Sequence, residues 1–181
     1  MWVSISGAPV FDSEGSFKGY RGTGREISAR KQAEADIERL AFYDPLTELP
    51  NRRLLIDRLS QAIAASARRS SYGALLFIDL DNFKALNDTC GHDKGDQLLK
   101  QVALRLASCV RDSDTVARLG GDEFVVLIDD AGLIPGDVIA TARAVADKVL
   151  VQLNTPFDVE GRVHRSGCSI GDDPSGLLQP L

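Results

Sequence analysis

The chain has 181 residues and a mass of 19.5 kDa, which is enough for one well-packed domain with a small appendage. Its net charge of −5 disfavours a non-specific polyanion binder, although that total is compatible with a local basic patch. No apolar run is long enough to span a bilayer, and the first residues lack the pattern of a signal peptide. Three widely spaced cysteines, Cys90, Cys109 and Cys168, disfavour a disulfide framework or a zinc site. We therefore expect reduced thiols in a cytoplasmic protein.

The N-terminal residues 1–24 are predicted to form two strands joined by a turn. Residues 2–6 alternate between apolar and polar side chains, residues 12–15 form a turn cluster, and residues 17–23 form a second run of strand-forming residues. An isolated hairpin is only marginally stable in water, so we expect this segment to belong to a larger unit.

A helix is predicted to begin at Ala29, with Ser28 as its N-terminal cap. Its apolar side chains form a narrow stripe on an otherwise charged surface: Ala33, Ile37, Leu40 and Ala41. Such a stripe is typical of a short coiled-coil seam, and it would equally suit docking on the chain's own domain.

The next elements alternate between helices and strands. A helix is expected after Pro50, with Leu55, Leu59, Ala62 and Ile63 on one face. The unbroken apolar run of residues 74–78 has the length of a strand, and it predicts a central strand that is buried on both faces. This strand ends in acidic residues at 79 and 81. A further helix is expected from about Gly95 to Cys109, with its apolar face inward.

The C-terminal half is expected to contain two hairpins around a helix. Residues 115–119 and 124–128 flank Gly120-Gly121, which suits a two-residue turn because both central positions need positive φ. A helix is expected over 135–153, followed by a hairpin around 160–161. The last ten residues show no regular period.

If the Gly-Gly hairpin lies antiparallel beside the buried strand, four carboxylates gather at one end of the sheet. Asp79 and Asp81 end the buried strand, whereas Asp122 and Glu123 follow the Gly-Gly turn. Like charges held together cost free energy unless a cation offsets them, and oxygen ligands favour Mg²⁺. Any one of these acids alone would be interpreted as a solvated turn residue. Their combination around a hairpin instead favours a metal-dependent phosphoryl-transfer site.

Residues 118–124, Arg-Leu-Gly-Gly-Asp-Glu-Phe, contain the motif that names the GGDEF family of diguanylate cyclases. Two further motifs lie in register with it. Residues 44–52 resemble the family's opening motif, with Glu48 where Gly is usual. Residues 79–88 and 91–96 resemble its nucleotide-binding segment. Three ordered motifs over about eighty residues make a chance match a poor explanation.

The resemblance implies an α+β fold in which a mixed central sheet is flanked by helices, related to the palm of nucleotidyl cyclases. It implies an enzyme that condenses two GTP into cyclic di-GMP and two pyrophosphates, with Mg²⁺ or Mn²⁺ as cofactor. Each subunit of a homodimer would hold one GTP, and the product would act as a feedback inhibitor. Neither nucleic acid nor a membrane is an expected partner of this segment.

The resemblance also implies residue roles. The metal ligands would be Asp79, the backbone carbonyl of Leu80, Asp122 and Glu123, and the catalytic residues would be Asp122, Glu123 and Lys84. Substrate-binding residues would be Asn82, Phe83, Lys84, Asn87, Asp96, Leu99 and Arg118. Structural alternatives remain for several: Asn87 as a helix cap, Asp96 as a helix N-terminal charge, and Phe83 and Leu99 as core residues.

Residues 111–114, Arg-Asp-Ser-Asp, fit the family's RxxD inhibitory motif, and the spacing to Gly120 also matches. Arg111 and Asp114 would then grip the guanine and phosphates of the product. A solvated loop pair is the alternative interpretation.

The chain is predicted to divide into four segments. Residues 1–28 resemble the C-terminal end of a PAS sensor domain, 29–43 a signalling linker helix, and 44–171 an incomplete GGDEF domain, followed by an atypical tail at 172–181. The family's last strand–helix portion, which supplies cations to the triphosphate, is not matched by these final residues. We therefore expect impaired activity and uncovered apolar sheet surface. The alternatives to a cyclase are a module that binds GTP or cyclic di-GMP without turnover, and a remnant without function of its own.

Overall fold

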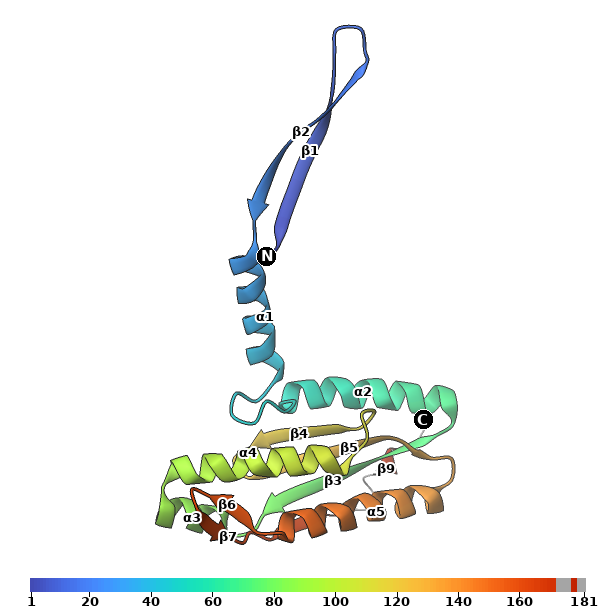
Figure 1. The fold of residues 1–181 in the computed structure, drawn as a ribbon. Helices are drawn as coiled ribbons and strands as arrows, with labels where there is room; N and C mark the ends of the chain where they lie inside the picture. The colour runs from blue at the N-terminus through green and yellow to red at the C-terminus, as the bar shows by residue number, and fades with distance from the viewer. Residues whose placement is uncertain (172–176, 179–181) are drawn as a thin grey trace. The chain divides into compact units, whose positions relative to one another are not determined.

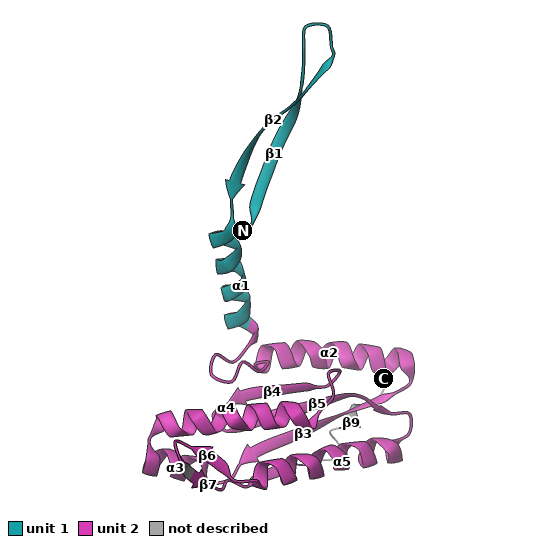
Figure 2. Ribbon diagram, viewed as in Figure 1, with its two compact units in different colours: residues 1–41 teal, residues 42–181 magenta. Residues whose placement is uncertain are grey.

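The computed structural model describes residues 1–171 and 177–178. The chain forms two compact units, residues 1–41 and 42–181, coloured separately in Figure 2. Within the described part of the chain, no helix combines the length and apolar character needed to cross a membrane. All three cysteines are free thiols, as the sequence predicted.

The first unit contains the expected pair of strands. β1 (Val3–Phe11) and β2 (Phe17–Glu26) pair antiparallel, and one irregularity in register falls between Val10 and Phe11. The Asp12 carboxylate accepts hydrogen bonds from the backbone N–H groups of Glu14 and Ser16, at 3.0 and 2.8 Å. This side-chain bonding is what makes residues 12–15 a turn.

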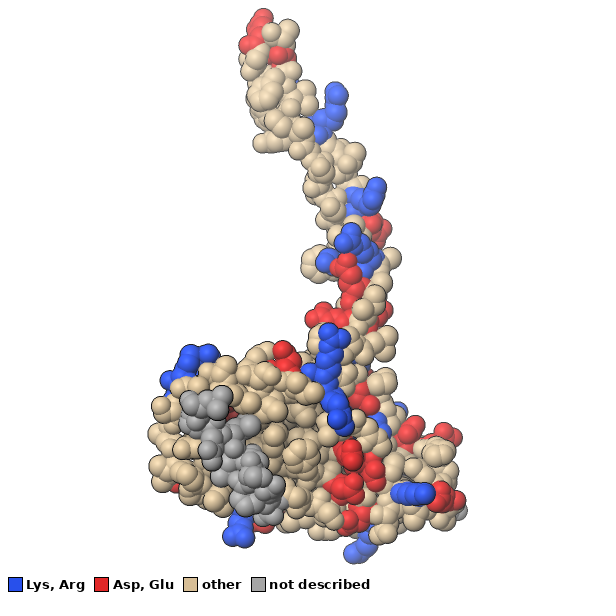
Figure 3. All heavy atoms as spheres, turned by 180° about the vertical axis from the view of Figure 1, so that it is seen from behind, with Lys and Arg blue, Asp and Glu red and all other residues tan. Residues whose placement is uncertain are grey.

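Helix α1 (Ser28–Phe42) begins one residue earlier than the sequence predicted, because the N–H of Lys31 donates to the carbonyl of Ile27. The hydroxyl of Ser28 accepts from the backbone N–H of Trp2, so the predicted capping role is replaced by a contact with the chain's start. Along the helix, Arg30 and Lys31 both pair with Glu34. Figure 3 shows basic and acidic side chains interspersed over the first unit.

The second unit is built on an antiparallel sheet with the strand order β4-β5-β3-β8 (Figure 1). The strands are β3 (Tyr72–Leu80), β4 (Thr115–Gly120), β5 (Glu123–Gly132) and β8 (Cys168–Gly171), and β9 (Leu177–Leu178) also pairs with β3. The α+β class with helices around a central sheet is confirmed. Every ladder described is antiparallel, whereas the resemblance implied a mixed sheet.

Helices cover both faces of this sheet. The helices are α2 (Arg52–Arg69), α3 (Phe83–Cys90), α4 (His92–Cys109) and α5 (Pro135–Asn154), and a small hairpin is formed by β6 (Phe157–Val159) and β7 (Arg162–His164). In Figure 1, α2 lies on one face, and α4 and α5 lie on the other. Arg105 links α4 to the end of α5 and to the start of β6. Its guanidinium donates to the carbonyls of Gln152 and Pro156 and stacks on the ring of Phe157.

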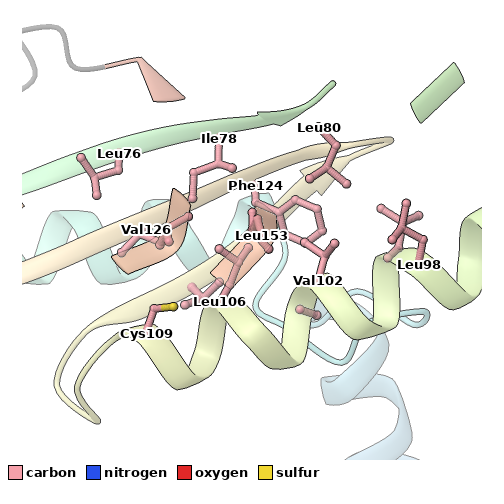
Figure 4. Close-up of a cluster of buried hydrophobic side chains, with 14 of the residues drawn as sticks. Leu76, Ile78, Leu80, Leu98, Val102, Leu106, Cys109, Phe124, Val126 and Leu153 are labelled. Atoms are coloured by element: carbon pink, nitrogen blue, oxygen red, sulfur yellow. The ribbon is translucent and has the colours of Figure 1, made fainter. Parts of the chain in front are cut away.

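The main core lies between the sheet and helices α4 and α5 (Figure 4). It contains alternate residues of β3 and β5 and the inward face of α4: Leu76, Ile78, Leu80, Phe124, Val126, Leu98, Val102 and Leu106. A smaller cluster packs α2 against the opposite face of β4 and β5. The apolar face predicted for the helix after Pro50 is confirmed for Leu55, Leu59 and Ala62, whereas Ile63 belongs to neither cluster. The inward face predicted for the helix from about Gly95 to Cys109 is also confirmed, although α4 begins earlier, at His92.

The central strand is not buried on both faces as predicted. β3 lies between β5 and β8, but its Phe77 side chain is 53% exposed, whereas its neighbour Ile78 is only 2% exposed. Leu75, on the same face as Phe77, is half-buried against the α2 cluster. Apolar character therefore located the strand correctly but did not report how far α2 covers its second face.

The Gly-Gly hairpin differs by one residue from the predicted turn. Gly120 pairs with Glu123, so Gly121 and Asp122 occupy the tip, and the register shifts between Arg118 and Gly120. Gly120 and Gly121 have φ values of 145° and 54°, which explains why glycine suits these positions. The shift places Asp122 at the tip itself.

Candidate active site

Strand pairing brings the acidic residues of β3 and β5 together. Asp79 is the cross-strand partner of Glu123, and Asp122 immediately precedes Glu123 at the hairpin tip. On the other side of β3, Asp79 pairs with Ser169 of β8. The pairing register of β3 with β5 therefore brings the carboxylates together at this end of the sheet.

The charges of this group act on one another. Loss of hydration, followed by the negative charges of Asp122, Glu123 and Asp81, raises the pKa of the Asp79 carboxyl above its usual range. A carboxylate with three acidic neighbours is poised to gain from a cation, because a cation would remove this repulsion. The arrangement therefore has the electrostatic character of a cation site.

The donor set fits Mg²⁺ bound together with phosphates. Among the described residues, no three His, Cys, Asp or Glu side chains come together as a ready-made metal cage. Mg²⁺ in nucleotide enzymes usually has one or two protein carboxylates, and substrate phosphates and water complete its shell. Asp79 and Asp122, with acidic neighbours that raise the pKa of Asp79, match that pattern.

The guanidinium group of Arg118 is bound by other groups of the protein, the Asp44 carboxylate and the Gly121 carbonyl. Its Nη1 lies 3.0 and 3.1 Å from the two carboxylate oxygens of Asp44, and its Nε and Nη2 donate to the carbonyl of Gly121 at 3.0 and 2.7 Å. The backbone N–H of Arg118 also donates to the carbonyl of Pro50. These contacts connect the opening loop to the hairpin tip, and they favour a positioning role over direct substrate contact.

The turn from β3 to α3 presents backbone amides. Asn82 precedes α3 with φ 59°, in the left-handed region, and makes no side-chain capping bond. Lys84 is exposed in the first turn of α3, whereas Phe83 is buried in the main core. The first amides of a helix lack acceptors within the helix, so a helix N-terminus with a nearby cation suits a phosphate.

Helices α3 and α4 meet at Asn87 and Gly95. The Oδ1 of Asn87 is buried and has no hydrogen-bond partner, and a Cβ added to Gly95 would lie only 2.0 Å from it. Asp96 is exposed beside this contact. Leu99 is 1% exposed within the main core, which favours the core interpretation that the sequence also allowed.

The Arg111–Asp114 segment forms a tight turn. Asp114 accepts from the N–H of Arg111 through Oδ2 at 3.0 Å, and its own N–H donates back to the carbonyl of Arg111. Asp114 is buried, whereas Arg111 is exposed and lines a hollow of about 410 Å³ against α5. The other lining residues are Ala140, Thr141, Ala144, Val145 and Lys148.

Three structurally important contacts were not predicted from the sequence. Gly95 makes room for Asn87, Asp44 binds Arg118, and Ser169 donates to Asp81 at 2.9 Å. Each joins residues that belong to different motifs or elements. The presence of Asp44 and Arg118 in motifs was a signal for both residues, but nothing in their spacing indicated that they meet.

A family model described as diguanylate cyclase, GGDEF domain, matches residues 41–173. The chain belongs to this family. It is 46% identical over 140 residues to the bifunctional diguanylate cyclase/cyclic di-GMP phosphodiesterase MucR of Pseudomonas aeruginosa. That match covers 77% of this chain and 20% of MucR, so the chain spans about a fifth of the relative's length.

Solved structures show the same fold. The isolated GGDEF domain of TpbB from Pseudomonas aeruginosa has a TM-score of 0.66 and 38% identity, with 74% of this chain and 80% of that chain covered. The coiled coil and GGDEF domain of DgcB from Caulobacter crescentus, in complex with c-di-GMP, has a TM-score of 0.68 and 25% identity. That match covers 82% of this chain and 78% of the other.

Proposed function

We propose that the second unit condenses two GTP molecules into cyclic di-GMP and two pyrophosphates. The observation that carries this proposal is the pairing of Asp79 with Glu123 beside Asp122 at one end of the sheet. Membership of the diguanylate cyclase family supports the same conclusion.

In the proposed reaction, the ribose 3′-hydroxyl of one GTP attacks the α-phosphorus of the other, and the reverse attack closes the ring. Each step forms one oxygen–phosphorus bond and breaks the bond to pyrophosphate. Bound Mg²⁺, held by Asp79, Asp122 and the Leu80 carbonyl, would offset the phosphate charge. Glu123 would receive the hydroxyl proton, and Lys84 would stabilise charge on the phosphates.

The nucleotide contacts follow the same geometry. The backbone N–H groups of Asn82 and Phe83 at the start of α3 would donate to phosphate oxygens, and Asn87 and Asp96 would bind the guanine. Each domain would hold one GTP, so catalysis would require two copies to face each other. Arg118 would act indirectly, because its guanidinium is engaged by Asp44 and the Gly121 carbonyl.

The direct test is to incubate the purified chain with GTP and Mg²⁺ and to quantify cyclic di-GMP and pyrophosphate. Asp79→Ala and Asp122→Ala should abolish Mg²⁺-dependent nucleotide binding and turnover, whereas Asp147→Asn, an exposed acid on α5, should change neither. Unchanged binding by both active-site variants would contradict the metal assignment.

A second candidate function is binding of cyclic di-GMP at Arg111, because this exposed cation lines the hollow beside α5. Asp114 would support this site by bracing the turn rather than by contacting the ligand, since it is buried and bonded to the N–H of Arg111. Arg111→Ala should weaken calorimetric binding of cyclic di-GMP far more than binding of GTP. Equal losses for the two ligands would argue against a separate site.

A further inference from the structure

Asp81 is bound to the segment that leads into β8. Its backbone N–H donates to the carbonyl of Gly167 at 3.0 Å, and its Oδ1 accepts from the hydroxyl of Ser169 at 2.9 Å. The buried hydroxyl of Ser166 lies 3.3 Å from the carbonyl oxygen of Asp81. The backbone and the side chain of Asp81 are therefore both engaged by the segment 166–169.

Gly167 provides the space for this carboxylate. A Cβ added to Gly167 would lie 2.6 Å from Oδ2 of Asp81 and 3.5 Å from its Cγ. Real Cβ atoms do not approach an oxygen so closely, so any side chain at position 167 would displace the carboxylate. The Asp81 side chain thus lies between the bare backbone of Gly167 and the Ser169 hydroxyl.

These contacts lie where β3 passes into the turn before α3. Asp79 and Leu80 pair with Ser169 and Cys168, and Asn82, directly after Asp81, adopts φ 59°. A left-handed non-glycine residue costs free energy and persists only where neighbouring contacts hold it. The Asp81 contacts are the nearest described bonds that secure the chain just before this residue.

We propose that Asp81 is a positioning residue rather than a metal ligand. Asp81 is held by Ser169 and Gly167 and in turn fixes the turn from β3 to α3. This fixes the positions of the Asn82 and Phe83 N–H groups, which would donate hydrogen bonds to phosphate oxygens. This inference rests on the proposed function for its catalytic consequence. The acids at this end of the sheet then divide into the three with a proposed part in catalysis, Asp79, Asp122 and Glu123, and one carboxylate with a structural task.

Substitution by asparagine separates the two roles. An asparagine at position 81 retains an oxygen that accepts from Ser169, but it removes the negative charge that a Mg²⁺ ligand supplies. Asp81→Asn should therefore preserve Mg²⁺-dependent binding of a non-hydrolysable GTP analogue to within about threefold, since a neutral acceptor keeps most of such a bond. Asp79→Asn should lose that binding by about tenfold or more.

The first measurement uses the free chain. Hydrogen exchange at the amides of Asp81 and Leu86, which donate to the carbonyls of Gly167 and Asn82, should accelerate in two variants. These are Gly167→Ala, which displaces the carboxylate, and Ser169→Ala, which removes the donor without a clash. Gly171→Ala is the matched control, because Gly171 lies in the same strand as Ser169 and its added Cβ meets no atom of the described residues within 4 Å. Unchanged exchange in both variants would overturn the positioning role.

The second measurement is calorimetric titration of the GTP analogue with and without Mg²⁺. Ser169→Ala should weaken nucleotide binding while leaving its dependence on Mg²⁺ concentration unchanged. If Asp81→Asn lost Mg²⁺ dependence as fully as Asp79→Asn, Asp81 would be a ligand and the inference would be wrong. If the unaltered chain bound no nucleotide, the proposed function would fail, and the exchange measurement would still decide whether Asp81 secures the turn.

Discussion

Among the described residues, Asn87 and Asp114 each have a buried Oδ1 without a hydrogen-bond partner, and that of Asn87 lies where α3 meets α4. Leaving a buried acceptor unpaired costs about 1–3 kcal/mol, a cost that natural structures rarely carry without a reason. The atom lies against Gly95, where an added Cβ would come within 2.0 Å. The absence of a side chain at position 95 therefore determines where the Asn87 amide lies.

Gly95→Ala should remove nucleotide recognition while leaving the fold intact. The new methyl group would push aside the end of the Asn87 side chain, which can rotate, and it would lie 3.2 Å from Cζ of Phe83, which must shift by a few tenths of an ångström. Alanine favours the helix over glycine by about 1 kcal/mol, which offsets this crowding. We expect the affinity for a GTP analogue to fall to that of Asn87→Ala, with a thermal unfolding midpoint close to that of the unaltered chain. Calorimetry and thermal denaturation provide the two measurements.

Gly136→Ala serves as the control, because Gly136 also lies in a helix and its added Cβ meets nothing within 4 Å. It should leave nucleotide affinity unchanged. Full retention of affinity in Gly95→Ala would show that the contact between α3 and α4 does not orient Asn87.

At the scale of elements, the opening loop and the Gly-Gly hairpin are joined through Asp44 and Arg118. Burial raises the pKa of the Asp44 carboxyl, but hydrogen bonds from Thr47 and Arg118 outweigh it and lower the pKa below the usual 3.8. A carboxyl with a lowered pKa in the folded state stabilises the fold above its unfolded pKa. That contribution disappears as pH falls through the folded value.

Asp44→Asn should therefore reduce stability at pH 7 but have progressively less effect as the pH falls below about 4, the ordinary range of a carboxyl pKa. Urea unfolding of the two proteins at a series of pH values measures this difference. A stability gap of the same size at pH 7 and at pH 2 would show that the Asp44 charge does not contribute.

The two faces of β3 give an internal comparison of packing. Phe77 is 53% exposed, whereas the adjacent Ile78 is 2% exposed in the main core. Ile78→Ala should destabilise the second unit by about 2–5 kcal/mol because it leaves a cavity in a packed core. Phe77→Ala should cost clearly less, since much of its surface already faces solvent. Denaturant unfolding at pH 7 measures the free energy of unfolding of both variants. Equal losses of this free energy would mean that the Phe77 side chain is buried.

At the scale of the whole molecule, the chain divides into two compact units that differ in how they are stabilised. Residues 42–181 contain both hydrophobic clusters, whereas β1, β2 and α1 contribute no buried residue to either. A hairpin and one charged helix bury too little apolar surface for independent stability.

A chain of residues 42–181 should accordingly unfold in one cooperative transition, with a midpoint close to that of the main transition of the full chain. Differential scanning calorimetry of both chains measures this. A midpoint lowered by many degrees would show that residues 1–41 contribute to the stability of the second unit.

The sequence alone located most of the elements and identified the acidic group, although it gave no bounds for α3 or β8. Apolar periodicity located β3 and the inward faces of α2 and α4, because helix and strand periods depend on local geometry. The Gly-Gly motif placed Asp122 and Glu123 at one end of β5, because antiparallel pairing of β4 and β5 follows from a tight hairpin. Their position beside Asp79 depended on the pairing of β3 with β5, which the sequence offered only as a hypothesis.

Only the tertiary structure decided how these parts contact one another. Arg118 meets Asp44 across 74 residues, and Ser169 meets Asp81 across 88 residues. No period or local preference encodes such pairs, because they depend on how helices and strands pack in three dimensions. The same packing left Phe77 exposed on a strand that its composition marked as buried, since burial depends on the neighbouring elements as well as on the residue itself.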